Sequence, residues 1–481
     1  MLTRRQLVSG AGAVCLFGSA TRAPRGRALG PEVAPVAGKI VAVELIAAER
    51  PTALACFGGA ALPLWTFAEG AWPPLIRLEL GDRLEATLKN QLPRADETTS
   101  IHWHGIRLPN DQDGVPYLVQ RPVWPGESFR YAFAPPDAGT FFFHTHCNTV
   151  EQLGRGLEGI LIIDGDVTEP YDADIVLLLR DWRIEPGTAE FASFATLRGA
   201  GRAGTYGPLR SVNGADNPRI SLPASSDCRL RIINSDPTRI MRIGVEGADA
   251  VIAAIDGVAI PLMTLTTWAM GPGMRMDLVL RSPPPGGVAS LVDSSAESHI
   301  ELARLVGLGA PRQARAFDPA PLRAGRIPAP DLANATRIGF RLQSSAAGAA
   351  IAATETALGV AVAAICLSSR SFWSINGQSW PDRDHPRLPP PLAVLQRGRS
   401  YVFELWNDTD FSHPIHIHGH SLTFLSSDQR NLPAHHADTI LLTPGERAEV
   451  AFIANNPGDW MFHCHVIEHQ ENGMMGYLRI I

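Results

Sequence analysis

Four His-x-His pairs constrain the fold of this 481-residue chain more than any other feature of its sequence. Two pairs lie near the front, in "HWHG" and "FFFHTH", and two lie near the back, in "HPIHIHGH" and "FHCH". Similar lengths of chain separate the pairs in each half, His104–His144 and His418–His463. The flanks agree too, because "AGTFFFHTH" parallels "PGDWMFHCH" and a glycine follows both "HWH" and "HIH". This pattern predicts an internal duplication: two related β domains, each with two His-x-His strands.

The region between the two halves predicts a further domain of a different kind. Residues 169–322 contain strand-like runs such as "DIVLLLRDW" and "RMDLVLRS" but a single histidine, His299, so we expect no metal ligands there. The length, at about 150 residues per domain, and the 44 Gly and 39 Pro favour three turn-rich β domains. The predicted class is therefore all-β, with domains at 29–168, 169–322 and 323–481. The Ala-rich segment 346–366 is the exception, which we expect to form a covering helix.

The first 28 residues predict an export signal. A twin arginine, Arg4 and Arg5, precedes an apolar stretch from Leu7 to about Ala20 that is too short for a stable membrane anchor. This arrangement resembles a twin-arginine signal, which exports folded proteins and implies a periplasmic or otherwise exported protein. A disordered tail is the alternative. The net charge of −6 gives no sign of a nucleic-acid-binding surface.

The segment "MFHCHVIEH" predicts two metal centres on one piece of backbone. Buried imidazoles without partners are costly, so four His-x-His pairs in duplicated surroundings favour a metal cluster over packing. Successive side chains of a strand point to opposite faces. His463 and His465 should therefore share one side of the strand, while Cys464 faces the other side.

The residues around Cys464 indicate which metal binds on its side. His413, Cys464 and His469 can supply two imidazoles and a thiolate, with Met474 as a weak fourth contact. Two His, one Cys and a distant Met are typical of a blue-copper electron-transfer site, whereas zinc rarely recruits Met. Eight other histidines, half from each end of the chain, are too many for one ion. Their cluster should lie between the first and third domains: His102, His104, His144, His146, His416, His418, His463 and His465.

With these motifs, the chain resembles the multicopper oxidases, the family of laccases, bilirubin oxidases and bacterial cuprous oxidases. The resemblance covers nearly the whole mature chain and all four copper motifs. It implies three cupredoxin-like Greek-key β-sandwich domains and four coppers, one of type 1, one of type 2 and two of type 3. By motif position it implies type 1 ligands His413, Cys464, His469 and Met474, type 2 ligands His102 and His416, and type 3 ligands His104, His144, His146, His418, His463 and His465.

The resemblance also implies a reaction. A small reducing substrate would lose one electron at the type 1 site, through the catalytic residues His469 and Cys464, and dioxygen would be reduced to water at the cluster. Asp113, in "LPNDQDGVP", matches a family acid near the type 2 copper that can orient ligands and pass protons. A turn role before Gly114 is the alternative, and both can hold. Many bacterial relatives have Glu where this chain has Gln470, and Glu468 or Glu471 are the candidates to compensate.

The copper ligands do not identify the substrate. Specialised cuprous oxidases carry a Met-rich insertion in domain three, but this chain has nine Met in total and none within 346–366. We therefore favour a laccase-like oxidase of phenols or aromatic amines. The alternatives are a periplasmic metallo-oxidase for Cu(I) and a non-enzymatic copper-binding protein. We further expect a monomer, substrate entry at an exposed edge of His469, Asp438 either near that edge or at a strand end or turn, and His435 and His436 in a solvated loop.

Overall fold

The computed structural model describes residues 38–167, 169–185, 187–295, 299–311, 316–345, 348–349, 371–380 and 388–481. These residues form six β-sheets, two in each of three successive parts of the chain, with a few short helices. The prediction of an all-β chain built from β-sandwiches is therefore confirmed. The predicted export signal lies outside the described residues, and so does the predicted helix at 346–366 apart from two of its residues. The bounds between the domains stay a prediction.

The first sandwich consists of two four-stranded sheets. One sheet has the order β2 (Leu62–Thr66), β1 (Ile40–Thr52), β4 (Arg83–Gln91) and β6 (Ser128–Phe133). The other has the order β3 (Leu75–Glu79), β8 (Glu158–Asp164), β7 (Gly139–His144) and β5 (His102–His104). The connections contain η1 (Ala55–Phe57), η2 (Asn110–Gln112) and α1 (Thr149–Gly154). Burial alternates along β4 but is continuous along β7, so β7 is covered on both faces.

The middle sandwich has a six-stranded and a five-stranded sheet. The larger has the order β10 (Leu209–Val212), β9 (Ala173–Trp182), β12 (Asp227–Asn234), β17 (Arg275–Arg281), β14 (Ala250–Ile255) and β15 (Val258–Thr264). The smaller has the order β11 (Arg219–Pro223), β19 (Ile300–Leu308), β18 (Val288–Asp293), β13 (Met241–Glu246) and β16 (Trp268–Met270). A one-turn helix, α2 (Leu197–Ala200), lies in the connection from β9 to β10.

The third sandwich again has six and five strands. The larger sheet has the order β21 (Trp373–Ile375), β20 (Thr336–Ser344), β23 (Ser400–Asn407), β28 (Arg447–Ile453), β25 (Leu422–Ser427) and β26 (His435–Ala437). The smaller has the order β22 (Ala393–Leu395), β30 (Met475–Ile480), β29 (Gly458–Cys464), β24 (His413–Ile417) and β27 (Thr439–Leu442). The short helix α5 (Ile467–Glu471) links β29 to β30.

The first and third sandwiches repeat the same pairing around their histidines. His102 of β5 lies opposite His144 of β7, and His416 of β24 lies opposite His463 of β29, each in an antiparallel ladder. The parallel pair β1 and β4 also has a counterpart in the parallel pair β20 and β23. The equal registers explain why the His-x-His pairs recur with similar spacing and similar flanks.

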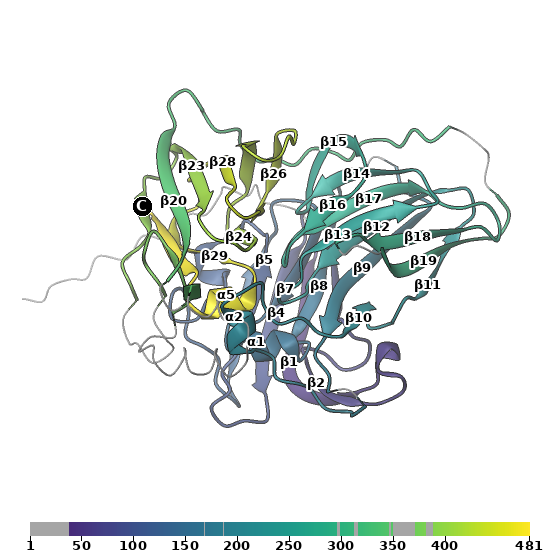
Figure 1. The fold of residues 1–481 in the computed structure, drawn as a ribbon, viewed down its shortest axis with the longest axis horizontal. Coiled ribbons are helices and arrows are strands. Elements are labelled where there is room, and N and C mark those ends of the chain that lie inside the picture. The colour runs from purple at the N-terminus through teal and green to yellow at the C-terminus, as the bar shows by residue number, and fades with distance from the viewer. Residues whose placement is uncertain are drawn as a thin grey trace, which may run out of the picture.

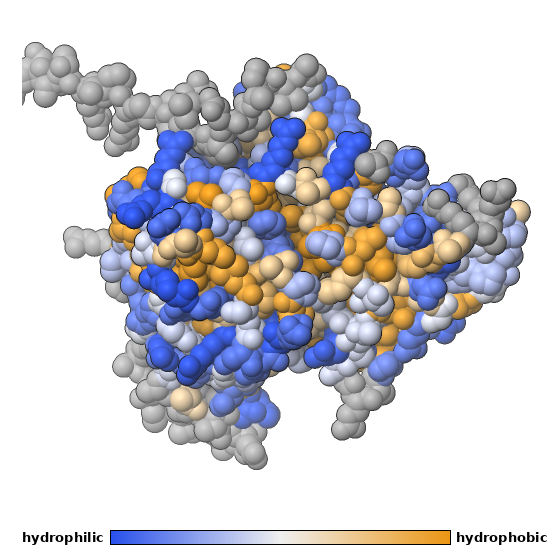
Figure 2. Space-filling view, turned by 90° about the horizontal axis from the view of Figure 1, so that it is seen from above, coloured by the Kyte–Doolittle hydropathy of each residue, from blue (hydrophilic) through white to orange (hydrophobic). Residues whose placement is uncertain are grey.

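The three sandwiches meet around one central region. In Figure 1 the third sandwich (green to yellow) stands beside the middle one (teal), and the first (purple to blue) lies below and between them. The helices α1, α2 and α5 gather where the three meet, and α5 contacts both of the others. Figure 2 shows a face on which hydrophilic residues surround a band of hydrophobic ones, an ordinary mixture for a protein surface. Among the described residues, no helix has the length and apolar character needed to cross a membrane.

Candidate metal centre

The strand β29 sends neighbouring side chains to two different sites. On one side, the Cys464 Sγ lies 3.5 Å from the Nδ1 of His413 and 3.6 Å from the Nδ1 of His469. On the other side, the ring of His463 lies in a group with His146 and His418. The alternation expected of a strand therefore separates the thiol from the imidazoles next to it in the chain.

The three-residue site has the donor atoms of a metal site. His413, Cys464 and His469 are fully buried. The Nε2–H of His469 donates a hydrogen bond to the carbonyl of Arg202 at 2.5 Å, and the Nε2 of His413 is hydrogen-bonded to the Thr409 hydroxyl at 2.8 Å. The two Nδ1 atoms then face each other at 3.0 Å. Because a neutral imidazole has one N–H and one lone pair, the two facing lone pairs and the nearby sulfur call for a cation.

Met474 lies beside this site. Its backbone carbonyl accepts the N–H of Cys464 at 3.0 Å, and its own N–H donates to the carbonyl of His469 at 3.0 Å. The residue is fully buried. Both hydrogen bonds hold Met474 next to two of the three predicted ligands.

The eight remaining histidines of the motifs gather in a second site. Each is buried, and they come from β5, β7, β24, β29 and the residues directly after these strands. Their nitrogen atoms form three close groups, His102 with His104 and His416, His104 with His144 and His465, and His146 with His418 and His463. The structure thus brings together all eight residues that the sequence assigned to one cluster.

The outer nitrogens of several of these rings are fixed by hydrogen bonds. The Nδ1 of His102 and of His416 donate to the carbonyls of Asp113 and Asp438, each at 3.0 Å. The Nδ1 of His463 donates to the carbonyl of Cys464 at 2.9 Å. These three rings therefore have their N–H outside and their lone pair inside, the orientation that a carbonyl or carboxylate imposes on a metal-binding histidine.

Most of the inner nitrogens have no hydrogen-bond partner among the described residues. The unsatisfied atoms are His102 Nε2, His104 Nδ1, His144 Nε2, His146 Nε2, His416 Nε2 and both nitrogens of His465. The Nε2 atoms of His418 and His463 face each other at 3.1 Å, although both rings hold their protons on Nδ1. Burial lowers the pKa of six of these imidazoles, so they stay neutral, which is the form that binds metals: His104, His144, His146, His418, His463 and His465. The donor set fits several metal ions in one cluster.

Asp113 lies against this cluster. Its Oδ2 accepts from the Nδ1 of His418 at 2.9 Å, and its Oδ1 lies 3.2 Å from the Nδ1 of His102. It also ends the turn η2, so the predicted turn position and the contact with the cluster occur at the same residue. Gly114 has a φ of +86°, and a Cβ there would lie 1.8 Å from the carbonyl oxygen of Ile101. Only glycine lets this turn approach β5 so closely.

Of the two alternatives for Asp438, the position near the substrate edge is wrong and the strand-end position is confirmed, because Asp438 lies between β26 and β27. Asp438 is buried beside the cluster, with its Oδ1 3.2 Å from the Nε2 of His104 and 3.3 Å from the Nδ1 of His416. Its carbonyl accepts the N–H of Ile417, because β27 directly after it pairs with β24. The sequence between the two motifs carried no sign of this pairing.

Arg275 and Asp256 are functional candidates that the sequence did not reveal. Arg275 donates to both carboxylate oxygens of Asp438, at 2.8 and 2.6 Å. Burial alone would raise the pKa of Asp438, but Arg275 lowers it well below its ordinary value. Asp256 accepts the backbone N–H of Thr439 at 3.0 Å, and burial together with the charge of Asp438 raises its pKa to about 7.

Two further expectations are wrong. His435 is buried within β26, where its ring stacks on Phe424, so it does not lie in a solvated loop, and His436 on the same strand is half-buried. His469 has no exposed edge, because Trp373 and the loop around Arg202 cover its ring.

The two glutamates near Gln470 are already engaged in contacts. Glu468 is buried and paired with Arg183, and the carboxylate of Glu471 accepts the N–H of Val150 at 3.1 Å. Gln470 itself is buried. Each acid therefore has a structural contact in addition to any role in supplying protons.

Comparisons with known proteins agree with this geometry. Two family models described as multicopper oxidase match residues 52–167 and 367–480. A solved multi-copper oxidase from Pseudomonas Thermotolerans is 37% identical, covers 92% of this chain and 100% of its own, and superposes with a TM-score of 0.81. The chain belongs to the multicopper oxidase family.

Curated relatives point the same way. The multicopper oxidase MmcO of Mycobacterium tuberculosis is 28% identical over 92% of this chain and 91% of its own length. Laccase-1 of Botryotinia fuckeliana is 25% identical over 83% of this chain and 75% of its own length. As a multicopper oxidase, the protein is a copper-dependent oxidoreductase that uses dioxygen and a reducing substrate.

Proposed function

We propose that this multicopper oxidase is laccase-like: it couples one-electron oxidation of a phenol or aromatic amine to the four-electron reduction of dioxygen to two waters. One observation carries the proposal. Cys464, at a buried two-imidazole, one-thiol site, lies between His463 and His465, whose rings belong to a cluster of eight inward-facing imidazoles. An electron-accepting site and a dioxygen-reducing site would thus be joined by a short covalent path.

We infer that the protein holds four coppers. His413, Cys464, His469 and Met474 would hold the type 1 ion, and His102 and His416, through their Nε2 atoms, the type 2 ion. The two type 3 ions would be held by His104, His144 and His465 on one side and by His146, His418 and His463 on the other. Bound copper would supply the one-electron redox chemistry at the first site and the binding and reduction of dioxygen at the second.

The protein's own groups would prepare both sites. Backbone carbonyls fix the outer N–H of His102, His416 and His463, so that their inner lone pairs are aligned before metal binds. Asp113 contacts His418 and His102 and would deliver protons to the cluster. Burial of all these groups excludes bulk water from the reacting centre.

The composition supports an organic substrate over Cu(I). Soft thioethers capture Cu(I), yet the chain has nine Met, none of them within 346–366. The test is oxygen uptake by the copper-loaded protein with a phenol, with Cu(I) and with Fe(II). Uptake of one dioxygen per four molecules of phenol supports the proposal. Uptake with Cu(I) alone would make the protein a metallo-oxidase, and no uptake with any donor would leave a copper-binding protein.

We also infer the setting in which the protein acts. Residues 1–28 would direct export of the folded chain through the twin-arginine route, and domains at 29–168, 169–322 and 323–481 would form a monomer. Replacing Arg4 and Arg5 by Lys should retain the protein in the cytoplasm, as measured by fractionation. Light scattering coupled to size exclusion tests the monomer.

A further inference from the structure

One loop of the middle sandwich covers the mononuclear site. The loop Thr196–Tyr206, here called the lid, contains α2 and comes from the connection between β9 and β10. Its Arg202 carbonyl accepts the Nε2–H of His469 at 2.5 Å. Its Ala200 carbonyl accepts the indole N–H of Trp373 at 2.7 Å, and the Trp373 ring lies 4.6 Å from the His469 ring. The lid therefore binds both aromatic groups on the outer side of the site.

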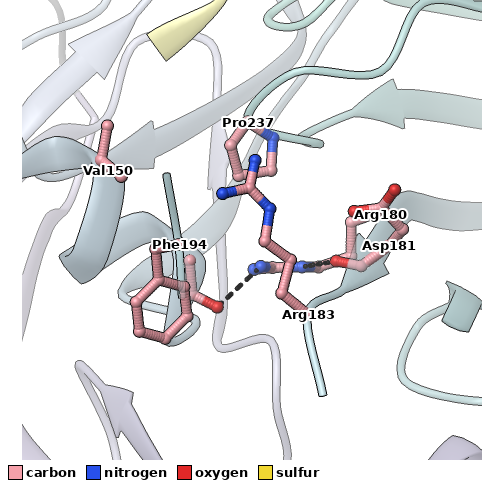
Figure 3. Close-up of a pocket in the computed structure, with 7 residues that line it drawn as sticks. Val150, Arg180, Asp181, Arg183, Phe194 and Pro237 are labelled. Carbon is pink, nitrogen blue, oxygen red and sulfur yellow. Dashed lines mark hydrogen bonds between the residues drawn. The ribbon is translucent and has the colours of Figure 1, made fainter. Parts of the chain in front are cut away.

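Glu468, the residue before His469, holds the other end of the lid. The Oε2 of Glu468 accepts the backbone N–H of Thr205 at 2.6 Å. Arg183 lies 3.4 Å from the Oε1 of Glu468 and also donates to the carbonyl of Thr205. Figure 3 shows Arg183 near Phe194 and Pro237, around a cavity of about 10 Å³, the lower limit for one water molecule. Both contacts of Thr205 hold this end of the lid to Glu468 and Arg183.

Hydrogen bonds within the lid hold it in one shape. The hydroxyl of Thr196 accepts the N–H of Gly199 at 2.9 Å, and the Gly199 carbonyl accepts the N–H groups of Arg202 and Gly204, both at 3.0 Å. A Cβ at Gly199 would lie 2.0 Å from the Thr205 hydroxyl oxygen and 2.9 Å from the Oε2 of Glu468. Glycine at this position is therefore what allows the lid to close on Glu468.

The outer surface of the lid suits an aromatic donor. Leu197 and Tyr206 are exposed hydrophobic residues near its two ends. The guanidinium of Arg239 lies 4.3 Å from the centre of the Tyr206 ring, which holds that ring in place. A flat ring can pack against such residues without reaching His469.

We propose that the lid is the specificity-determining element of this oxidase. It places the peptide of Arg202 between His469 and the solvent, so an aromatic substrate docks on the lid and its electron enters across the hydrogen bond from His469 to Arg202. Each substrate molecule loses one electron, and four such steps with four protons reduce one dioxygen to two waters. Phenols that must bond directly to the imidazole react slowly while the lid is closed. This inference rests on the proposed function.

The test opens the lid with Gly199→Ala in the full-length, copper-loaded protein. The control is Gly325→Ala, because a Cβ there would meet its nearest atoms at an ordinary 3.9 Å. Hydroxyl-radical footprinting read by mass spectrometry reports exposure of Trp373 and His469, with the exposed His299 as internal standard. We expect both residues to be protected in the wild type and in the control, and to be modified at least about tenfold faster in Gly199→Ala.

Kinetics supply the second measurement. In Gly199→Ala the KM should fall several-fold for a phenol that must hydrogen-bond directly to the imidazole, and it should rise for an aromatic donor that docks on the lid. The rate with hexacyanoferrate(II), which needs no contact with imidazole, should stay within about twofold. The proposal would be overturned if Trp373 and His469 of the wild type were modified as fast as His299. It would also be overturned if a variant with faster modification of these two residues kept unchanged phenol kinetics. If the wild type took up no oxygen with hexacyanoferrate(II), this result would instead contradict the proposed function.

A milder variant keeps the test decisive if Gly199→Ala does not fold. Trp373→Phe retains a ring beside His413 and His469 but removes the N–H that the Ala200 carbonyl accepts. We expect the same changes in His469 footprint and phenol KM, but smaller. A variant that keeps its blue colour and shows neither change would overturn the proposal.

Discussion

Replacing Arg275 by methionine should strongly destabilise the protein, because this arginine connects all three sandwiches. Its guanidinium donates to the carbonyl of Thr140 in the first sandwich at 3.3 Å. In the middle sandwich it donates to the carbonyls of Gly273 and Asp256, both at 3.0 Å. In the third it makes the two short bonds to the carboxylate of Asp438. All of these contacts are buried.

The size of the effect follows from what the substitution leaves behind. Methionine fills part of the space but removes the charge and all of these hydrogen bonds, so Asp438 remains a buried carboxylate without its counter-ion. Breaking one partner of a buried ion pair costs about 3–5 kcal/mol. Adding Asp438→Asn removes the unpaired charge, and the double variant should therefore lose less stability than the two single variants summed.

The assay is urea unfolding of the copper-free proteins, since bound metal would add its own stability to the folded state. Arg479→Met is the matched control, because Arg479 also forms two bonds with one carboxylate, that of Asp459, but its side chain is 43% exposed. Exposed pairs contribute about 0–1 kcal/mol. An Arg275→Met protein within about 1 kcal/mol of the wild type would refute the reasoning, and so would strict additivity in the double variant.

Three other outcomes test the site and its surroundings. Cys464→Ser should abolish the intense blue absorption and the oxidase activity while most cluster copper stays bound; a variant that remains blue would contradict the type 1 assignment. Asp113→Asn should keep its copper and its colour but slow the recovery of the blue band on readmitting oxygen by about 100-fold in stopped flow; recovery at the wild-type rate would remove Asp113 from proton delivery. Burial and the neighbouring Asp236 raise the pKa of Asp181 to about 8 from 3.8, so the folded state holds a proton that the unfolded chain releases. Stability should therefore fall as pH rises from about 4 to 8, and Asp181→Asn should flatten that fall in melting temperature, whereas an equally steep profile in the variant would exclude Asp181 as its source.

The sequence predicted side-chain directions well wherever one strand decides them. Trp103 lies between His102 and His104 on β5 and packs on Tyr131 and Phe133, away from the cluster. Cys464 is separated in the same way from its neighbours on β29. Both results follow from the two-residue period of a strand, which needs no knowledge of the surrounding fold.

Contacts between distant parts of the chain were not predictable in this way. Asp438 reaches the cluster because β27 happens to pair with β24, and Arg275 reaches Asp438 from a strand of another sandwich. The exposed edge expected for His469 is lost to the lid, whose Arg202 comes from the middle sandwich. No local sequence pattern predicts these contacts, since each depends on how whole sandwiches pack against one another.

The packing of the sandwiches also gives the cluster an approximate two-fold arrangement. His102 stacks on His418 with ring centres 3.7 Å apart, and His104 stacks on His416 at 3.8 Å. Each stack joins the first histidine of one His-x-His pair to the second histidine of the pair in the other half of the chain. The duplicated halves therefore meet face to face around the cluster.

The acids follow the same arrangement, and the middle sandwich makes them unequal. The carbonyl of Asp113 accepts from His102 of its own half, and its carboxylate accepts from His418 of the other half. Asp438 makes the equivalent pair of contacts, with His416 of its own half and His104 of the other half. Arg275 of the middle sandwich binds Asp438 alone: within the described chain, no arginine or lysine lies within 4 Å of the Asp113 carboxylate. Burial would raise the pKa of Asp438, but Arg275 lowers it and keeps the carboxylate charged. Asp438 therefore orients imidazoles with a carboxylate that stays charged, and we propose that, of these two acids, Asp113 supplies protons to the cluster.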